Sequence, residues 1–135
     1  MRRKKQKRQP ASPPISDKAK MSQRVWEYAG DFIRMGKTWE DRHSLLNAAC
    51  SAWNISRNPP EQRKANLDHY MVEYRRHSAD ADAAQMAGVR SNLEKLIEKK
   101  LEMFPNDLRQ IVGAQIVRSG DQERIEVASG MFSWR

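Results

Sequence analysis

The residues best suited to catalysis or metal binding are three histidines and one cysteine. Glu40 and His43 form half of the Glu-x-x-His pattern of carboxylate-bridged metal sites, but no second copy of the pattern joins them. His69 and His77 are eight residues apart, so on a helix they point about 80° away from each other. We therefore expect no metal site and no cofactor.

The single cysteine does not indicate nucleophilic chemistry either. Cys50 lies among Leu46, Ala49 and Trp53, a setting typical of a small buried apolar residue. The sequence contains no glycine-rich phosphate loop, nucleophile elbow or pair of carboxylates at catalytic spacing. We expect neither enzyme activity nor a small-molecule substrate.

Positive charge is concentrated near the N-terminus. The 135 residues carry a net charge of +8, and residues 1–20 hold eight Lys and Arg residues against Asp17 alone, a net charge of +7. Residues 21–135 are nearly neutral, at +1. Residues 1–20 contain one Ile, three Pro and no aromatic residue, too little apolar surface to offset the entropy of ordering. The sequence predicts a disordered basic arm over residues 1–20.

Such an arm suits nucleic acid, because Lys and Arg on a flexible chain neutralise phosphates and release condensed counterions. An electrostatic tether to another acidic partner and a merely solubilising segment are alternatives, and in a eukaryotic host the cluster would resemble a nuclear-localisation signal. A second group of cations begins a later predicted helix. The predicted contacts to DNA or RNA are Arg2, Arg3, Lys4, Lys5, Lys7, Arg8, Arg57, Arg63 and Lys64.

The predicted location is cytoplasmic, or nuclear if the host is eukaryotic. No stretch approaches the roughly 18 consecutive apolar residues of a membrane span, so we expect no membrane partner. The charged start is followed by the polar, proline-rich residues 9–14, where a secretory signal needs an apolar segment. One cysteine allows no intramolecular disulfide, which fits a reducing compartment.

The predicted fold is mainly α: a compact four-helix bundle, then a short helix and a β-hairpin. Apolar residues at helical spacing predict a helical body over residues 21–104, with helices at about 22–35, 39–54, 59–76 and 80–104. Gly36 stands where a left-handed residue would end the first helix. Thr38 and Asp41 resemble a capping box at the start of the second.

Residues 105–135 show a different pattern. Residues 107–112 are compatible with a short helix closed by Gly113, whereas alternating apolar residues around 119–122 predict a hairpin. Two strands alone are marginally stable, so the hairpin must pack on the helices or pair with another chain. The apolar tail that follows carries Phe132 and Trp134, which either fold back onto the body or anchor in a protein partner.

Residues 45–70 also admit a helix-turn-helix, in which the second helix would enter the major groove. The turn lacks the usual Gly, and Pro60 and Arg63 stand where buried apolar residues are expected, so an ordinary helical corner is favoured.

The sequence thus predicts a small, non-catalytic, nucleic-acid-associated accessory protein whose body docks on a protein partner or forms homo-oligomers. The alternatives are a pure protein-interaction subunit of a larger assembly and a helix-turn-helix regulator.

Overall fold

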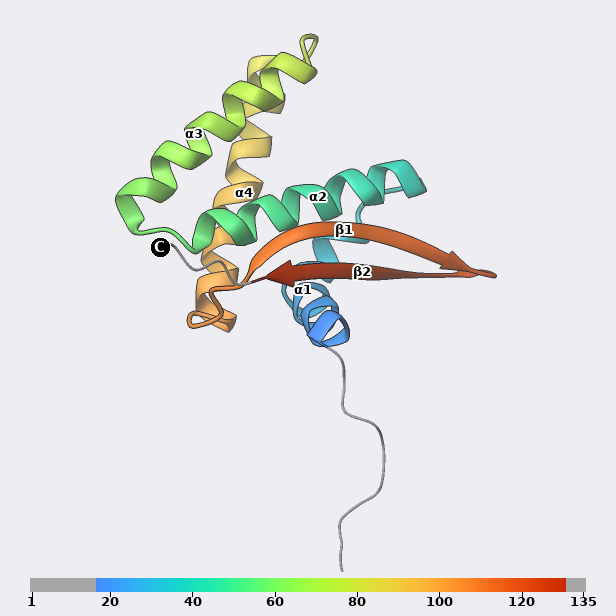
Figure 1. The fold of residues 1–135 in the computed structure, drawn as a ribbon. Helices are drawn as coiled ribbons and strands as arrows, with labels where there is room; N and C mark the ends of the chain where they lie inside the picture. The colour runs from blue at the N-terminus through green and yellow to red at the C-terminus, as the bar shows by residue number, and fades with distance from the viewer. Residues whose placement is uncertain (1–16, 131–135) are drawn as a thin grey trace, which may run out of the picture.

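Four helices are followed by one antiparallel hairpin, which confirms a mainly α fold with a C-terminal hairpin (Figure 1). The computed structural model describes residues 17–130, with side chains from Lys20 onward. Within this range no helix is long and apolar enough to cross a membrane. The elements are α1 Asp17–Ile33, α2 Trp39–Ser56, α3 Pro60–His77, α4 Ala83–Met103, β1 Gln110–Ser119 and β2 Gln122–Gly130.

The core lies between α1, α2, α4 and one face of the hairpin, with β1 beside α2 and β2 beside α1 (Figure 1). Its largest side chains are Trp53 and Tyr28, both fully buried, whose rings meet edge to face at 5.7 Å. The Tyr28 hydroxyl donates to the Ala49 carbonyl at 2.6 Å, so burial leaves this polar group satisfied. Trp26, two residues before Tyr28, is 40% exposed, because one helix face cannot bury both rings.

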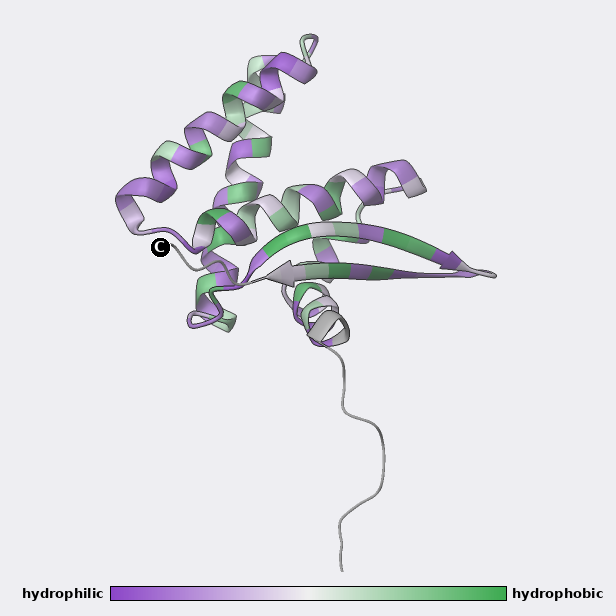
Figure 2. Cartoon of the chain, in the orientation of Figure 1, coloured by the Kyte–Doolittle hydropathy of each residue, from purple (hydrophilic) through white to green (hydrophobic). Residues whose placement is uncertain are grey.

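The third helix is only loosely part of this core. Leu67 is its one buried residue, and α3 projects away from the hairpin together with the first half of α4 (Figure 1). Colouring by hydropathy shows α3 to be mostly hydrophilic (Figure 2). An ion pair between Asp68 and Arg90, at 2.8 Å, joins the two projecting helices. The bundle is therefore compact around α1, α2 and α4 and open at α3.

The ends of the helices differ in detail from the prediction. Helix α1 begins at Asp17, so residues 17–20, predicted to belong to the arm, are helical. Helix α4 begins at Ala83 rather than at residue 80, because Asp82 caps it: Asp82 Oδ1 accepts from the Gln85 amide, and the Gln85 side chain accepts from the Asp82 amide, each at 2.8 Å.

Of the two predictions for the segment between α1 and α2, one is confirmed and one is wrong. The cap at Thr38 is confirmed, since its Oγ1 accepts from the Asp41 amide at 3.0 Å. The left-handed conformation predicted for Gly36 is wrong, because Gly120 is the one described glycine with positive φ. A Cβ on Gly36 would lie 2.7 Å from the Arg42 amide nitrogen, so this glycine allows the chain to approach α2 closely.

The short helix predicted for residues 107–112 is also wrong, because β1 begins at Gln110 and continues through Gly113. A β-bulge lies between Ile111 and Gly113. The inserted residue, Val112, reverses the alternation of faces, so that Ile111 and Ile116 both point into the core although they are five residues apart. The residues themselves do not predict where β1 begins, because this part of the strand is held by contacts with distant parts of the chain.

The hairpin prediction is confirmed with its turn at residues 119–122. Ser119 pairs with Gln122, and Gly120 adopts a φ of 65°, which two-residue hairpin loops require. Ile116 faces Ile125 across the ladder, and both side chains are buried against the helices. The hairpin thus gains its stability by packing on the helices of its own chain.

Side chains of α2 occupy the outer edge of β1. The Asn54 amide bonds to both backbone groups of Ile111, donating to its carbonyl at 3.0 Å and accepting from its N–H at 2.8 Å. Trp53 Nε1 donates to the Arg109 carbonyl at 2.8 Å. Asn54 therefore takes the place that a third strand would have, and this part of the edge is closed to other strands.

We expect Asn54→Ala to lower the free energy of unfolding by about 2 kcal/mol, because it removes two hydrogen bonds and leaves both backbone groups of Ile111 without a partner. Urea unfolding measures this loss. Asn47→Ala, the same change on an exposed position of α2, should stay within about 0.5 kcal/mol of the wild type. Equal effects of the two substitutions would contradict the role of Asn54.

Candidate nucleic-acid interface

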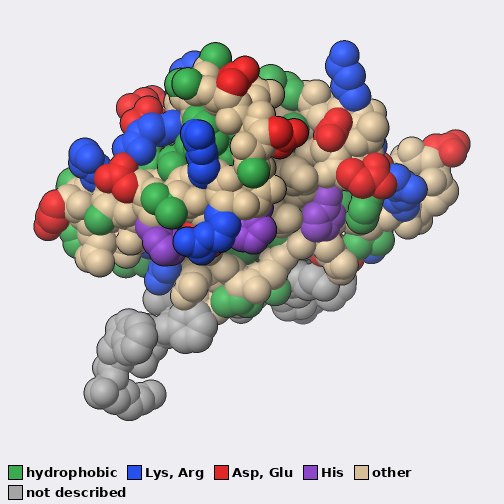
Figure 3. Space-filling view, turned by 90° about the horizontal axis from the view of Figure 1, so that it is seen from above, with side chains coloured by type: hydrophobic (Ala, Val, Ile, Leu, Met, Phe, Trp, Pro, Cys, Tyr) green, Lys and Arg blue, Asp and Glu red, His purple; other side chains and the backbone are tan. Residues whose placement is uncertain are grey.

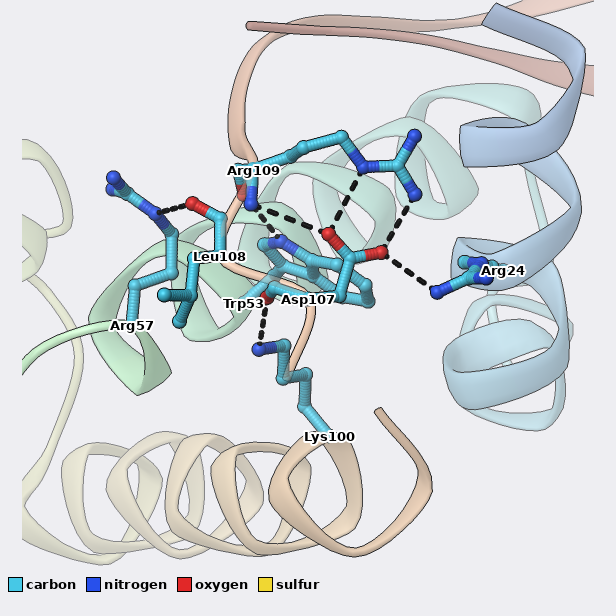
Figure 4. A network of polar contacts seen from close by, with 7 residues as sticks. All are labelled: Arg24, Trp53, Arg57, Lys100, Asp107, Leu108 and Arg109. Carbon is cyan, nitrogen blue, oxygen red and sulfur yellow. Dashed lines mark hydrogen bonds and ion pairs between the residues drawn. The ribbon is translucent and has the colours of Figure 1, made fainter. Parts of the chain in front are cut away.

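Three consecutive carbonyl groups between α4 and β1 are bound by side chains from two helices (Figure 4). Lys100 Nζ donates to the Asp107 carbonyl at 2.6 Å, Arg57 Nε donates to the Leu108 carbonyl at 2.8 Å, and Trp53 binds the Arg109 carbonyl. The segment 107–109 has no regular secondary structure. These donors replace the hydrogen bonds that a helix or strand would supply.

The carboxylate of Asp107 is the acidic centre of this region. Its side chain is 5% exposed and accepts from Arg109 Nε at 2.9 Å, Arg109 Nη2 at 2.6 Å and Arg24 Nη1 at 2.9 Å (Figure 4). Burial on its own would raise the pKa of Asp107, but the hydrogen bonds from Arg109 and the charges of Arg109 and Arg24 outweigh burial and lower this pKa. Asp107 therefore stays ionised and joins α1 to the start of β1.

Lys100 is a fully buried cation, with 0% exposure, and its Nζ lies 4.8 Å from the centre of the Trp53 ring. Burial lowers the pKa of Lys100, Asp107 opposes this shift, and the positive charges of Arg57 and Arg63 add to it. Arg57 and Arg63 therefore both lie close enough to Lys100 to act on its charge. We call Arg57, Arg63 and Lys100 the cationic corner.

Arg57 and Arg63 both donate to backbone carbonyls at this corner. Arg57 Nε is bound to the Leu108 carbonyl, and Arg63 Nε donates to the Ser56 carbonyl at 3.2 Å. Neither guanidinium forms an ion pair with a carboxylate among residues 17–130. Each is thus oriented through Nε by a neutral acceptor, while its charge can attract an anion from solution.

Three of the residues predicted to contact nucleic acid lie in the described part of the chain, and the structure separates two of them from the third. The structure brings Arg57 and Arg63 together at the corner. Lys64 instead forms an ion pair with Asp68 at 3.3 Å, a carboxylate that it shares with Arg90. The remaining predicted contacts lie outside the described residues, as do the proposed anchors of the tail: Arg2, Arg3, Lys4, Lys5, Lys7, Arg8, Phe132 and Trp134.

Charges of both signs are mixed on the face of the molecule seen from above in Figure 3. In the face seen in Figure 3, basic and acidic side chains alternate and neither forms one large patch. Many of these cations are in ion pairs, such as Arg42 with Glu123 at 2.7 Å, and this contact lowers the pKa of Glu123. A near balance of charges therefore covers most of the body.

The residues considered for catalysis or metal binding are not assembled into a site. No group of three or more His, Cys, Asp or Glu side chains that could hold a metal ion occurs within residues 17–130. Cys50 is 7% exposed, and burial raises its pKa to about 12, so it stays a thiol at neutral pH. His43 contacts the Trp39 ring at 5.1 Å between centroids.

Sequence analysis missed four residues that organise this region: Arg24, Lys100, Asp107 and Arg109. Lys100 had a readable signal, since it continues the buried α4 positions Leu93, Leu96 and Ile97 at helical spacing. A lysine in such a stripe must be buried or must end the stripe, and here it is buried. Asp107 carried no such signal, because its partners come from α1 and from two residues further along the chain.

Comparison of the chain with known protein families, with curated proteins and with solved structures finds no match. Functional inference therefore relies on the charges and contacts described above.

We expect Asp107→Asn to lower the free energy of unfolding at pH 7 by about 2 kcal/mol, because it weakens the bonds to Arg109 and Arg24 and leaves their charges uncompensated. The pKa of Asp107 is lowered in the folded state, so its stabilisation is complete above the unfolded pKa of about 3.9 and is lost as the pH falls further.

The difference in stability between wild type and Asp107→Asn should therefore be constant from pH 7 to about pH 4 and shrink below that. Urea unfolding at a series of pH values measures it. Asp121→Asn, at the exposed tip of the hairpin, is the matched control and should match the wild type throughout. A difference that persists undiminished to pH 3 would contradict the assignment.

Proposed function

We propose that this protein is a small, non-catalytic, nucleic-acid-associated accessory protein. Its basic N-terminal arm and the two arginines of the cationic corner, Arg57 and Arg63, bind phosphates, while the helical body docks on a protein partner. The observation that carries this proposal is the uneven distribution of charge along the chain.

Residues 1–16 carry six Lys and Arg residues and no acid, a charge of +6, whereas residues 17–130 carry eighteen basic and seventeen acidic residues, a charge of +1. A chain that needed only solubility could spread this charge over its surface. Six cations within seven residues, 2–8, instead place on one short segment enough charge to neutralise several phosphates and release their counterions.

The corner adds a structured contribution from the body. Arg57 and Arg63 are uncompensated by carboxylates in the described part of the chain and are held through Nε, so their amino groups are available to phosphate oxygens. The arm therefore supplies long-range attraction and grip, and the corner gives the bound strand a fixed position on the body.

A pure protein-interaction subunit is the second candidate, favoured by exposed apolar side chains near the start of β1. Leu108 is 52% exposed and Val112 is 57% exposed. Such residues are suited to a protein contact. The two candidates differ in one respect that can be measured directly, because only the first requires binding to nucleic acid.

The arm is tested by replacing Arg2, Arg3, Lys4, Lys5, Lys7 and Arg8 with Gln in the full chain and measuring affinity for a duplex against salt concentration. If all six cations contact phosphates, the slope of log K against log salt should fall by about 5. A control variant with Lys37, Lys95 and Arg75 changed to Gln, all exposed on the body, should keep most of the slope. The proposal is wrong if the wild type fails to bind at low salt.

The corner is tested by the double variant Arg57→Gln, Arg63→Gln, which should reduce the same slope by about 2. The matched control is Lys64→Gln, Arg76→Gln. It removes the same charge, but from cations paired with Asp68 and Glu73, and should reduce the slope by less than 1. Circular dichroism and urea unfolding establish that both variants are folded. Equal slopes for the two variants would show that net charge, and not the corner, determines binding.

A further inference from the structure

A groove with a volume of about 480 Å³ lies between the two projecting helices, α3 and α4. The helices meet at the turn that joins them and diverge toward the start of α3 (Figure 1). The apolar part of the groove consists of Leu67, Ile97 and Leu101. All of the lining residues belong to α3 and α4, so no other element of the described chain fills this groove.

Helix α3 buries little for its length. Leu67 is the one buried residue among its 18, and Tyr70 and Met71 are only half-buried against the core. A helix of this size is marginal in water and gains most of its stability from the tertiary packing of one face. A partner seated in the groove would supply the packing that α3 lacks within its own chain.

The charges along the groove are divided between its two walls. The charged lining residues are Arg63 and Lys64 on α3 and Arg90, Glu94 and Glu98 on α4. Arg90 lies toward the turn between the helices, where it binds Asp68 of α3 at 2.8 Å. The wider end of the groove therefore has a basic wall on α3 and an acidic wall on α4.

The charges of this wider end are weakly used within the chain. Glu98 forms no ion pair or hydrogen bond within residues 17–130, and Glu94 has only a 3.7 Å contact with Arg90. The Lys64 side chain is 76% exposed and lies 3.3 Å from Asp68, which Arg90 binds more closely. Lys64 and the two glutamates can thus pair with charges on another molecule.

We propose that a second copy of this chain occupies the groove and that the protein forms a two-fold dimer. A two-fold interface brings the same surface of both copies together, so that surface must complement itself. A basic wall beside an acidic wall meets this condition. With the two-fold axis along the groove, α3 of each copy lies on α4 of the other, and Lys64 faces Glu94 and Glu98 of the second copy. The four helices then form a bundle.

The size of this surface sets the expected strength of the dimer. At 1.5 Å per residue, α3 and α4 are about 27 and 31 Å long, and two packed helices are about 20 Å wide. The two helices thus offer roughly 500 Å² per copy, or about 1,000 Å² in total, the lower limit for a specific interface. We therefore expect the dimer to form at micromolar concentrations. The inference goes beyond the proposed function and does not depend on nucleic-acid binding.

Sedimentation velocity of the full chain from about 1 to 200 μM should show a monomer–dimer equilibrium. Lys64→Glu should weaken the dimer by about tenfold or more, because two attractive contacts become repulsive, and the double variant Glu94→Lys, Glu98→Lys should do the same. An equimolar mixture of the two variants should dimerise as well as the wild type. In the mixed dimer each acidic wall again faces a basic wall, so recovery also shows that both variants are folded.

The matched control is Arg76→Glu, which makes the same change of charge at an exposed position of α3 that does not line the groove. It should leave the dimer unchanged. A wild type that stays monomeric at all concentrations would overturn the inference and leave the groove to a different protein. A dimer that Lys64→Glu weakens no more than Arg76→Glu does, or a mixture that fails to recover, would also overturn it. None of these outcomes bears on the binding of nucleic acid, which is tested separately above.

Discussion

The hydrogen bonds from α2 to the backbone of Arg109, Ile111 and Ile116 determine the rest of the structure. A two-stranded hairpin is marginal in water, and α3 buries too little to contribute much to a core, so the fold depends on fixing the hairpin to α2. Asn54 does this by acting as a strand partner for Ile111, and Trp53 extends the contact to Arg109. The same attachment places Leu108 against Arg57, so stability and the charged surface have a common origin.

The electrostatics of the region follow from how little acid it contains. The carboxylate of Asp107 forms ion pairs with Arg109 and Arg24. Lys100 donates to the backbone carbonyl of Asp107 and has no share of this carboxylate. Arg57 and Arg63 are left with carbonyl acceptors, which orient a guanidinium without neutralising it. Elsewhere on the body cations are mostly matched by carboxylates, as in the pairs of Arg42 with Glu123 and Arg90 with Asp68. An excess of positive charge at one corner is therefore built into the packing of α2, α3 and α4.

Local patterns in the sequence identified the four helices, the hairpin and its turn, because each has a signal within a few residues: the cap at Thr38, the apolar stripes, and the turn residues around Gly120. They failed at residues 107–112, where partners from α2 and α4 override local propensity, and at Gly36, whose role is the close approach of α2. For the candidate site, Arg57 and Arg63 could be named from the sequence, because one lies just before α3 and the other lies in its first turn. The sequence could not show that Lys64 is in an ion pair while the two arginines are not. That difference depends on Asp68, which pairs with Lys64, and on the carbonyl groups that accept from the arginines.

Arm and corner differ in what they can contribute to recognition. A run of cations such as residues 2–8 attracts any nearby polyanion, and attraction to phosphates alone discriminates little between sequences because it requires no particular geometry. Guanidinium groups oriented by backbone carbonyls do impose one, since a strand bound to both Arg57 and Arg63 must take a particular direction across the body. Selectivity must then come from groups within reach of that direction. In the described part of the chain one such group is Leu108, whose carbonyl accepts from Arg57 and whose side chain is 52% exposed.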